Sequence, residues 1–484
     1  MSVIVSERPK QQSGAATNGR RVEHPSVTDR AARGKATRRE IGRRVHGEWE
    51  ASPARRDPVE QLEEQAQTRV SELVPIRYGR MLVSPFTFYR GAAKLMASDL
   101  ADQPRTDLHV QLCGDAHLSN FGAFAAPDRR QVFSINDFDE TLPGPFEWDV
   151  KRLVASFAVA GRDRGFDARE RRSINLTVTR AYREAMAEFA RMRTLDLWYA
   201  RLDVNDIAEQ IARRGSPKER KRFERNVAKA RSKESLRALA KLTHLVDGEP
   251  RIVSDPPLIM PIEDTVPPAQ HAELDAFMRN AIRSYRRTLS RDRRRLVERF
   301  RYVHAARKVV GVGSVGTRAW IVLMLGRDGG DPLVLQAKEA EASVLEPALG
   351  ASTYSSHGQR VVEGQRLMQS ASDIMLGWIR VDAPDGVKRD FYIRQLWDAK
   401  GSALVDAMGP AVMTFYAQVC GWTLARAHAR SGDAVAIASY LGSGDAFDQA
   451  LAAFAESYAD QNERDYDALA GAVATGRVRT QTGL

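Results

Sequence analysis

Residues 112–124 read LCGDAHLSNFGAF, and residues 135–153 read INDFDETLPGPFEWDVKRL. Each stretch starts within a short run of β-branched and aromatic residues, LHVQLCG and QVFSIND, which is typical of a strand bounded by turn residues. Asp115 and Asn120 are therefore expected five positions apart in a loop that leaves a strand. Turns use the same residue types, so GDAHLSN alone does not separate a turn from a functional loop. The acidic stretch that follows at a short distance favours a functional site.

The polar residues of the two stretches suit phosphoryl transfer. That reaction needs a carboxylate that orients the attacking hydroxyl and oxygen ligands that hold magnesium nearby. Asp115 and Asn120 together supply a carboxylate and an amide oxygen of the kinds that this chemistry needs. Asp137 or Asp139, at the end of an apolar strand, is expected to supply a further ligand.

The motifs GDAHLSN, INDFDE and GPFEWDVKRL together resemble the catalytic and metal-binding loops of the aminoglycoside phosphotransferase and choline kinase group, which are relatives of the protein kinases. The resemblance implies that Asp115 is the catalytic base and that Asn120 and Asp137 bind magnesium. His117 lies where that group often has a histidine, so it joins the catalytic set. Asp149 matches an aspartate that supports the catalytic loop from the following helix.

Two positions depart from the pattern of that group. The histidine that usually precedes the base by two residues is Cys113 here, and INDFDE offers two aspartates for the metal. Asp137 is preferred because it precedes Phe138, as the metal-binding aspartate does in the group, and Asp139 is the second candidate. The whole chain also resembles an uncharacterised bacterial family known as domain of unknown function 2252.

A glycine-rich segment, GVGSVG, lies between two predicted strands in a β-rich block that starts near residue 307. Glycines allow backbone N–H groups to approach phosphate oxygens, although a hairpin turn has the same composition. A dinucleotide-binding segment would continue into a helix, whereas TRAWIVLML predicts a strand and favours a kinase-type phosphate-binding loop. The candidate residues are Gly311, Gly313, Ser314 and Gly316.

The strand PLVLQAKEA carries Lys338 near its end, where a protein kinase has its phosphate-binding lysine. A partner glutamate is expected on the following helix, VVEGQRLMQ. Glu363 is the candidate there, with Glu341 and Glu346 as rivals. By itself, Lys338 is equally compatible with a solvated strand end, but its place after the glycine-rich segment favours the nucleotide site.

The segment that follows DFYIR resembles the hinge between the two lobes of a kinase, so Gln395 and Trp397 are predicted to contact the nucleotide. In kinases the glycine loop, lysine, glutamate and hinge precede the catalytic and metal-binding loops, whereas here they follow them by nearly two hundred residues. We therefore predict an α+β, two-lobed, protein-kinase-like fold that is circularly permuted. The segment WTLARAHARSG supports permutation because it resembles the helix that runs into the catalytic loop. Permutation is tolerated where the original chain ends lie close together.

The segment HARSGD offers a second candidate catalytic loop, with His428 and Asp433. It lacks the expected asparagine, because Ala438 stands five residues after the aspartate. We predict a structural role for His428, since a histidine near a helix end commonly binds backbone carbonyls.

The composition predicts a folded, soluble and cytoplasmic protein. Charged residues make up 28% and hydrophobic residues 43% of the 484 residues, and the formal net charge of +11 favours anionic partners. Two cysteines make no disulfide framework, and no secretory signal or membrane-spanning run is expected. The predicted parts are a disordered basic tail (1–60), a mainly helical lobe with the catalytic and metal-binding loops (61–300), a β-rich nucleotide-binding lobe (301–400) and a helical segment that completes the helical lobe (401–484).

The predicted function is ATP-dependent and magnesium-dependent phosphoryl transfer to the hydroxyl of a small molecule, with a protein acceptor left open. One alternative is a nucleotide-binding pseudokinase or an AMP-transferring regulator, which would use the same residues. A second alternative is nucleic-acid binding through the basic stretches 216–242 and 283–300. Interspersed acidic residues and sparse aromatics favour solvated, salt-bridged helices for these stretches, so nucleic acid is the less favoured partner.

Overall fold

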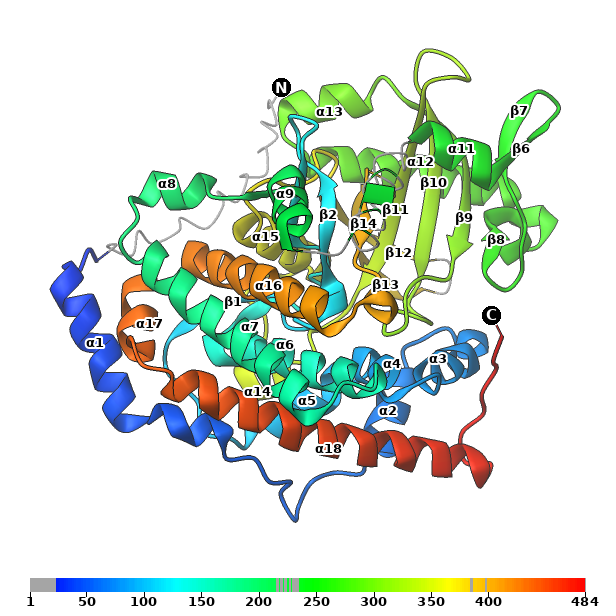
Figure 1. Cartoon of the computed structure of the whole chain (residues 1–484). Helices are drawn as coiled ribbons and strands as arrows, with labels where there is room; N and C mark the ends of the chain where they lie inside the picture. Colours follow the sequence, from blue (N-terminus) through cyan, green and yellow to red (C-terminus); the bar gives the residue numbers. More distant parts are fainter. Residues whose placement is uncertain are drawn as a thin grey trace, which may run out of the picture.

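The computed structural model describes residues 23–214, 235–383, 386–396 and 398–483, together with residues 217, 221, 224, 225 and 228. The described chain forms a helical lobe and a lobe built on a six-stranded antiparallel sheet (Figure 1). The described chain starts in the helical lobe, passes through the sheet lobe and returns to the helical lobe near its end. Helices and sheet are segregated rather than alternating, so the predicted α+β class is confirmed.

The helical lobe is packed around a central helix. The helices before residue 215 and after residue 409 are α1 (Val27–Glu40), α2 (Pro58–Ala66), α3 (Val74–Met81), α4 (Pro85–Gly91), α5 (Ala93–Ala101), α6 (Phe146–Asp163), α7 (Ala168–Phe189), α8 (Thr194–Tyr199), α9 (Val204–Arg214), α16 (Pro410–Ser431), α17 (Ala434–Leu441) and α18 (Ala446–Ala474). Every residue from Phe146 to Gly161 in α6 is buried, as expected for a helix covered on all sides. None of the described helices is long and apolar enough to cross a membrane.

Short strands hold the two acidic stretches in the helical lobe. They are β1 (His109–Leu112), β2 (Phe121–Ala125), β3 (Gln131–Ile135), β4 (Leu142–Pro145) and β5 (Leu202–Asp203). One loop connects β1 to β2. The other connects β3 to β4 and is called the acidic loop below. Leu112 pairs with Leu142, and Phe121 pairs with Ile135. The start of each loop therefore lies beside the end of the other, which brings the polar residues of the two loops together.

The sheet lobe has the strand order β12-β13-β11-β10-β9-β8, and all neighbouring strands are antiparallel. The strands are β8 (Ile259–Pro261), β9 (Arg301–Lys308), β10 (Ala319–Leu325), β11 (Pro332–Ala340), β12 (Gly377–Asp382) and β13 (Lys388–Gln395). The remaining α-helices and strands of the described chain are α11 (Ser235–Leu242), β6 (Thr243–Val246), β7 (Glu249–Ile252), α12 (His271–Arg287), α13 (Arg291–Val297), α14 (Glu346–Leu349), α15 (His357–Met368) and β14 (Gly401–Ser402), of which β14 pairs with β2 of the helical lobe. The predicted strands of this block and the predicted helix α15 are confirmed.

All residues of β11 are buried, because helices cover both faces of the sheet. Successive side chains alternate between the faces. Leu333 and Leu335 pack with α12, whereas Val334 packs with α11. Lys338 lies on the same face as Val334, so its stem leaves the sheet on the α11 side.

The predicted boundary at residue 300 is wrong. Ala238 and Leu242 of α11, and Ile282 and Tyr285 of α12, form cores with the large sheet rather than with the helical lobe. The sheet lobe therefore includes residues 235–300. Helical periodicity shows that a helix buries one face, but it does not show which partner covers that face.

The prediction of a disordered tail over residues 1–60 is wrong in the part that the structure describes. Helix α1 packs against α17 so closely that a Cβ added to Gly34 would lie 2.0 Å from the carbonyl oxygen of Ala436 (Figure 1). This helix buries Gly34 and Thr37 instead of large apolar residues, so its composition does not reveal the contact. Residues 1–22 lie outside the described part of the chain.

An arginine in the N-terminal segment links two helices by a buried ion-pair triad. The Arg55 side chain is 12% exposed and lies 2.6 Å from both Asp99 in α5 and Asp465 in α18. The two carboxylates are 3% and 4% exposed. Removal of the arginine would leave two buried carboxylates without their cation.

We expect Arg55→Ala to lower the free energy of unfolding by about 3–5 kcal/mol, the usual cost of breaking a buried ion pair from one side. Urea unfolding measures this change. Addition of Asp99→Asn and Asp465→Asn should recover part of the loss, because the remaining groups are neutral. The matched control is Arg56→Ala, which removes an exposed pair with Glu64 and should leave the urea midpoint unchanged. An equal loss in both single variants would contradict this account.

Candidate functional site

Asp149, in the first turn of α6, fixes the loop between β1 and β2. Its carboxylate accepts hydrogen bonds from the backbone N–H groups of Cys113 (2.7 Å) and Gly114 (3.0 Å). Gly114 has a φ of +84°, and a Cβ there would lie 2.3 Å from the carbonyl oxygen of Glu140. Only glycine fits this position. The predicted support of the loop by Asp149 is confirmed.

His428 reaches the same carboxylate from α16. Its Nε2 lies 3.2 Å from Asp149 Oδ2, and its Nδ1 lies 2.8 Å from the hydroxyl of Tyr182 in α7. The histidine is fully buried, so its predicted structural role is confirmed, although its partners are side chains rather than backbone carbonyls. Asp433 accepts a hydrogen bond from the N–H of Ala436 (3.0 Å) and caps α17.

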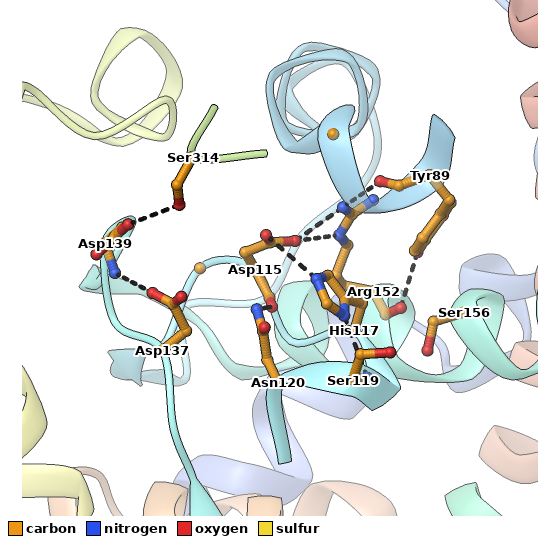
Figure 2. A network of polar contacts seen from close by, with 12 residues as sticks. Tyr89, Asp115, His117, Ser119, Asn120, Asp137, Asp139, Arg152, Ser156 and Ser314 are labelled. Atoms are coloured by element: carbon orange, nitrogen blue, oxygen red, sulfur yellow. Dashed lines mark hydrogen bonds and ion pairs between the residues drawn. The ribbon is translucent and has the colours of Figure 1, made fainter. Parts of the chain in front are cut away.

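Asp115 is held by a buried arginine from α6 (Figure 2). Arg152 Nη2 and Nε lie 2.8 Å and 2.9 Å from Asp115 Oδ1. The same guanidinium donates a hydrogen bond to the carbonyl oxygen of Tyr89 (2.7 Å) and lies 3.9 Å from the centre of the Tyr89 ring. The Asp115 carboxylate therefore has a fixed orientation and a neutralising cation before any ligand is present.

Arg152 is a site residue that the sequence analysis missed. It lies three residues after Asp149 in the quoted stretch, and residues three apart share one face of a helix. Because Asp149 is directed at the loop between β1 and β2, the side chain at position 152 is directed there as well. That spacing was the available signal, whereas a Lys-Arg pair in a helix is ordinarily solvated.

His117 and Asn120 stabilise the loop between β1 and β2 around Asp115. His117 Nε2 lies 3.7 Å from Asp115 Oδ2, and its Nδ1 accepts a hydrogen bond from the N–H of Ser119 (3.2 Å). Burial lowers the pKa of His117 to about 4, so the imidazole is neutral at pH 7. Asn120 donates a hydrogen bond from Nδ2 to the carbonyl oxygen of Asp115 (2.8 Å), which leaves its amide oxygen for another partner.

The acidic loop between β3 and β4 meets Lys338 from the sheet lobe. Lys338 Nζ lies 2.6 Å from Asp139 Oδ2 and 3.6 Å from Asp137 Oδ2. Asp139 also accepts hydrogen bonds from the hydroxyl of Tyr392 (2.6 Å) and from the hydroxyl of Ser314 (3.5 Å). Both oxygens of Asp139 thus have protein donors, which leaves Asp137 as the acidic-loop carboxylate more available to a cation.

The opposite charges of Lys338, Asp137 and Asp139 stabilise one another. Burial opposes the charge of Lys338, but the negative charges of Asp137 and Asp139 raise its pKa above the usual value. Burial also opposes the charge of Asp137, whose pKa is nevertheless lowered by Lys338, Arg394 and Lys400. The lysine and the aspartate are therefore both charged at neutral pH.

The prediction that Glu363 pairs with Lys338 is wrong. Glu363 forms an ion pair with Arg366 (3.1 Å) one turn further along α15. The α15 side chain that reaches the acidic loop is Arg360, which donates hydrogen bonds to the carbonyl oxygens of Asp139 (2.8 Å) and Thr141 (2.7 Å). Because Asp139 supplies the carboxylate for Lys338, a glutamate from the helix is not needed.

The glycine-rich segment forms the hairpin between β9 and β10 and reaches the acidic loop through Ser314. Gly311 and Gly316 have φ values of +68° and +91°, which favour glycine at both positions. A Cβ on Gly313 would lie 2.9 Å from the carbonyl oxygen of Arg90 in α4. The segment is thus packed against the helical lobe and lies beside the acidic loop, as the predicted nucleotide site requires.

The predicted hinge residues have different outcomes. Gln395 ends β13, and its backbone N–H donates a hydrogen bond to Asp373 (2.5 Å). Gln395 also lines a small pocket whose wall includes Asn136, Arg394 and Lys400. Its contact with a nucleotide stays a prediction. Trp397 lies outside the described residues.

The family model described as "Uncharacterized protein conserved in bacteria (DUF2252)" matches residues 69–472. The chain belongs to this family. No curated protein and no solved structure matches the chain. The matched range includes the loop between β1 and β2, the acidic loop, the glycine-rich segment and Lys338, so the DUF2252 domain contains the whole candidate site and excludes α1.

The oxygen donors in this DUF2252 domain suit magnesium bound together with a ligand. Magnesium is commonly held by one or two carboxylates with water and substrate phosphates, and Asp137 with the amide oxygen of Asn120 matches this chemistry. Within the described ranges, no group of three or more His, Cys, Asp and Glu side chains is arranged to hold a metal. The two oxygen donors of Asp137 and Asn120 therefore fit a magnesium ion that completes its coordination with water and ligand oxygens.

The neutral state of His117 predicts a dependence of stability on pH. Its pKa is about 4 in the fold against 6.5 without the fold, so the unfolded chain binds more protons between these values. The contribution of His117 to stability therefore decreases as the pH falls from 6.5 to 4. We expect the difference in unfolding free energy between the wild type and His117→Gln to shrink by about 3 kcal/mol over this range.

Urea unfolding of both proteins at several pH values measures this difference, and other titrating groups cancel because they are common to both. A difference that is constant between pH 7 and pH 4 would mean that His117 does not become harder to protonate on folding.

Proposed function

We propose that this protein is an ATP-dependent and magnesium-dependent phosphotransferase with a circularly permuted, protein-kinase-like fold. The observation that carries the proposal is the contact of Lys338 with Asp137 and Asp139. The lysine and the aspartates were assigned to one nucleotide site from separate motifs, and Lys338 and Asp139 are 199 positions apart in the chain. A permuted kinase-like fold requires this contact.

The order of elements in the sheet lobe supports the proposal. A glycine-rich hairpin joins β9 to β10, Lys338 lies on the next strand, and helix α15 separates that strand from β12 and β13. Protein kinases have a glycine-rich loop, a lysine on the third strand and a helix that follows it. The sheet lobe matches this sequence of parts, with Asp139 in place of the helix glutamate as the partner of Lys338.

The end of α16 supports the permutation. The backbone N–H of Gln111 in β1 donates a hydrogen bond to the hydroxyl of Ser431 (3.1 Å), the last residue of α16. A Cβ on Gly432 would lie 2.9 Å from the carbonyl oxygen of His109. The helix that resembles the one before a kinase catalytic loop thus ends beside the strand that leads into the candidate loop, although it follows that strand in the chain.

The residues have separate roles in the proposed reaction. Lys338 and the backbone N–H groups of the glycine-rich hairpin would hold phosphate oxygens, and Asn120 and Asp137 would hold magnesium. Bound magnesium neutralises the charge that develops on the transferred phosphoryl group. Asp115, oriented by Arg152, would accept a hydrogen bond from the acceptor hydroxyl and align it. His117 is neutral and buried, so it positions the loop rather than transferring a proton.

We expect calorimetry to show ATP binding that is tighter with magnesium than without it. Asp137→Asn should abolish the effect of magnesium, because it removes a negative charge from the cation site. Lys338→Met should weaken ATP binding at least tenfold, because a cation that contacts phosphate is lost. Glu363→Gln is the matched control, since Glu363 pairs with Arg366, and it should bind ATP like the wild type.

Absence of ATP binding in the wild type, with and without magnesium, would overturn the proposal. Binding without turnover would instead indicate a pseudokinase, and transfer of label from the α-phosphate of ATP to an acceptor would indicate AMP transfer. Thermal unfolding of each variant shows whether a loss of binding reflects a loss of the fold.

A further inference from the structure

A half-buried arginine beside the catalytic loop has no partner in the protein. Arg90 lies in the last turn of α4, and its Nε is closed to solvent without a hydrogen-bond acceptor. Among the residues that the structure describes, none forms a hydrogen bond or an ion pair with this guanidinium. A buried polar group is normally satisfied by a partner, so the exception requires an explanation.

The position of Arg90 is defined by its neighbours. Tyr89, the preceding residue, accepts a hydrogen bond from Arg152, which in turn holds Asp115 (Figure 2). The carbonyl oxygen of Arg90 lies against Gly313 at the tip of the glycine-rich hairpin. Arg90 therefore belongs to the part of α4 that lies between the catalytic loop and that hairpin.

Charge interactions agree with this position. The positive charge of Arg90 adds to burial in lowering the pKa of His117. Burial lowers the pKa of Arg90 itself, and the negative charges of Asp115 and Asp406 oppose that effect. The guanidinium is thus close enough to Asp115 for electrostatic interaction but forms no hydrogen bond with it.

Neutralisation of Asp115 does not explain Arg90, because Arg152 already performs that task at 2.8 Å. A second cation that remains unpaired in a half-buried place costs free energy. Such a cost is expected where the cation is kept for a ligand, as polar groups at binding sites commonly are.

We propose that Arg90 binds an anionic group of the acceptor, so that the acceptor is a hydroxyl compound carrying a phosphate or a carboxylate. This inference rests on the proposed function and defines its substrate class. An arginine binds either anion through two parallel N–H donors. A cationic acceptor, such as an amino sugar or choline, would meet Arg90 and Arg152 as like charges beside Asp115.

The test first saturates the nucleotide site of the full chain with magnesium and a non-hydrolysable ATP analogue. Inorganic phosphate and glycerol 3-phosphate are then titrated by calorimetry, with glycerol and choline as the neutral and cationic comparisons. We expect both anions to bind and the other two compounds not to bind. Arg90→Gln should weaken anion binding at least tenfold, and Arg90→Lys should retain most of it because the charge remains.

Arg105→Gln is the matched control, because the side chain of this exposed arginine has a hydrogen bond only to the carbonyl oxygen of Ala348 (3.2 Å) among the described residues. It should leave anion binding unchanged. Equal anion binding by the wild type and Arg90→Gln, or tighter binding of choline than of glycerol 3-phosphate, would overturn the proposal while leaving the phosphotransferase function intact. If Arg90→Gln lost binding of the ATP analogue together with binding of the anions, the proposal would also be overturned, since the arginine would then bind the nucleotide.

The two proposals fail separately. If the wild type binds no nucleotide, the phosphotransferase function fails, and phosphate is titrated into the free protein. Phosphate binding that depends on Arg90 would then still support an anion site, whereas binding that is unaffected by Arg90→Gln would remove it. Thermal unfolding of Arg90→Lys shows whether the fold survives if Arg90→Gln is unstable.

Discussion

The buried ammonium group of Lys338 constrains how the two lobes meet. Lys338 is 3% exposed and lies on a strand in which every residue is buried. A charge in such a place is costly unless a counter-charge accompanies it, and the sheet lobe leaves that task to Asp139 and Asp137 of the helical lobe. Separation of the lobes at this point would leave a buried cation without its partners on one side and two carboxylates without theirs on the other.

Arg360 applies the same constraint to the backbone. Its guanidinium is 2% exposed and donates hydrogen bonds to three carbonyl oxygens, of which two belong to the acidic loop. Lys338 therefore fixes the carboxylates of the loop, and Arg360 fixes its main chain. The acidic loop is thus held by the sheet lobe, whereas the loop between β1 and β2 is held by Asp149 and Arg152 of α6. Asp115 is thus positioned by α6 of the helical lobe, and Asp137 by Lys338 and Arg360 of the sheet lobe.

The sequence predicted the parts of the site that depend on local pattern. Asp115 and Asp137 lie shortly after the ends of β1 and β3, and Asn120 directly precedes β2. These strand ends are visible in the sequence as the limits of apolar runs. The prediction that Glu363 pairs with Lys338 was wrong because helical spacing does not show which neighbouring loop already supplies a carboxylate. Arg152 was missed because its direction can be inferred only when Asp149, three residues earlier on the same face of α6, is known to point at that loop. Helix α1 was missed because it buries Gly34 and Thr37, whose small side chains leave no apolar signal.

The return of the chain to the helical lobe has a consequence for biosynthesis. Helix α7 packs along α16, and α6 packs along α18, but more than two hundred residues of sheet lobe and connecting chain are synthesised between the two members of each pair. Domains usually fold in order as they leave the ribosome. Here α6, the centre of the helical lobe, remains partly uncovered until residues 410–474 have emerged. The apolar surface of α6 would therefore stay exposed during translation, as a surface of the kind that chaperones bind, and the sheet lobe can complete its core before the lobe that precedes it.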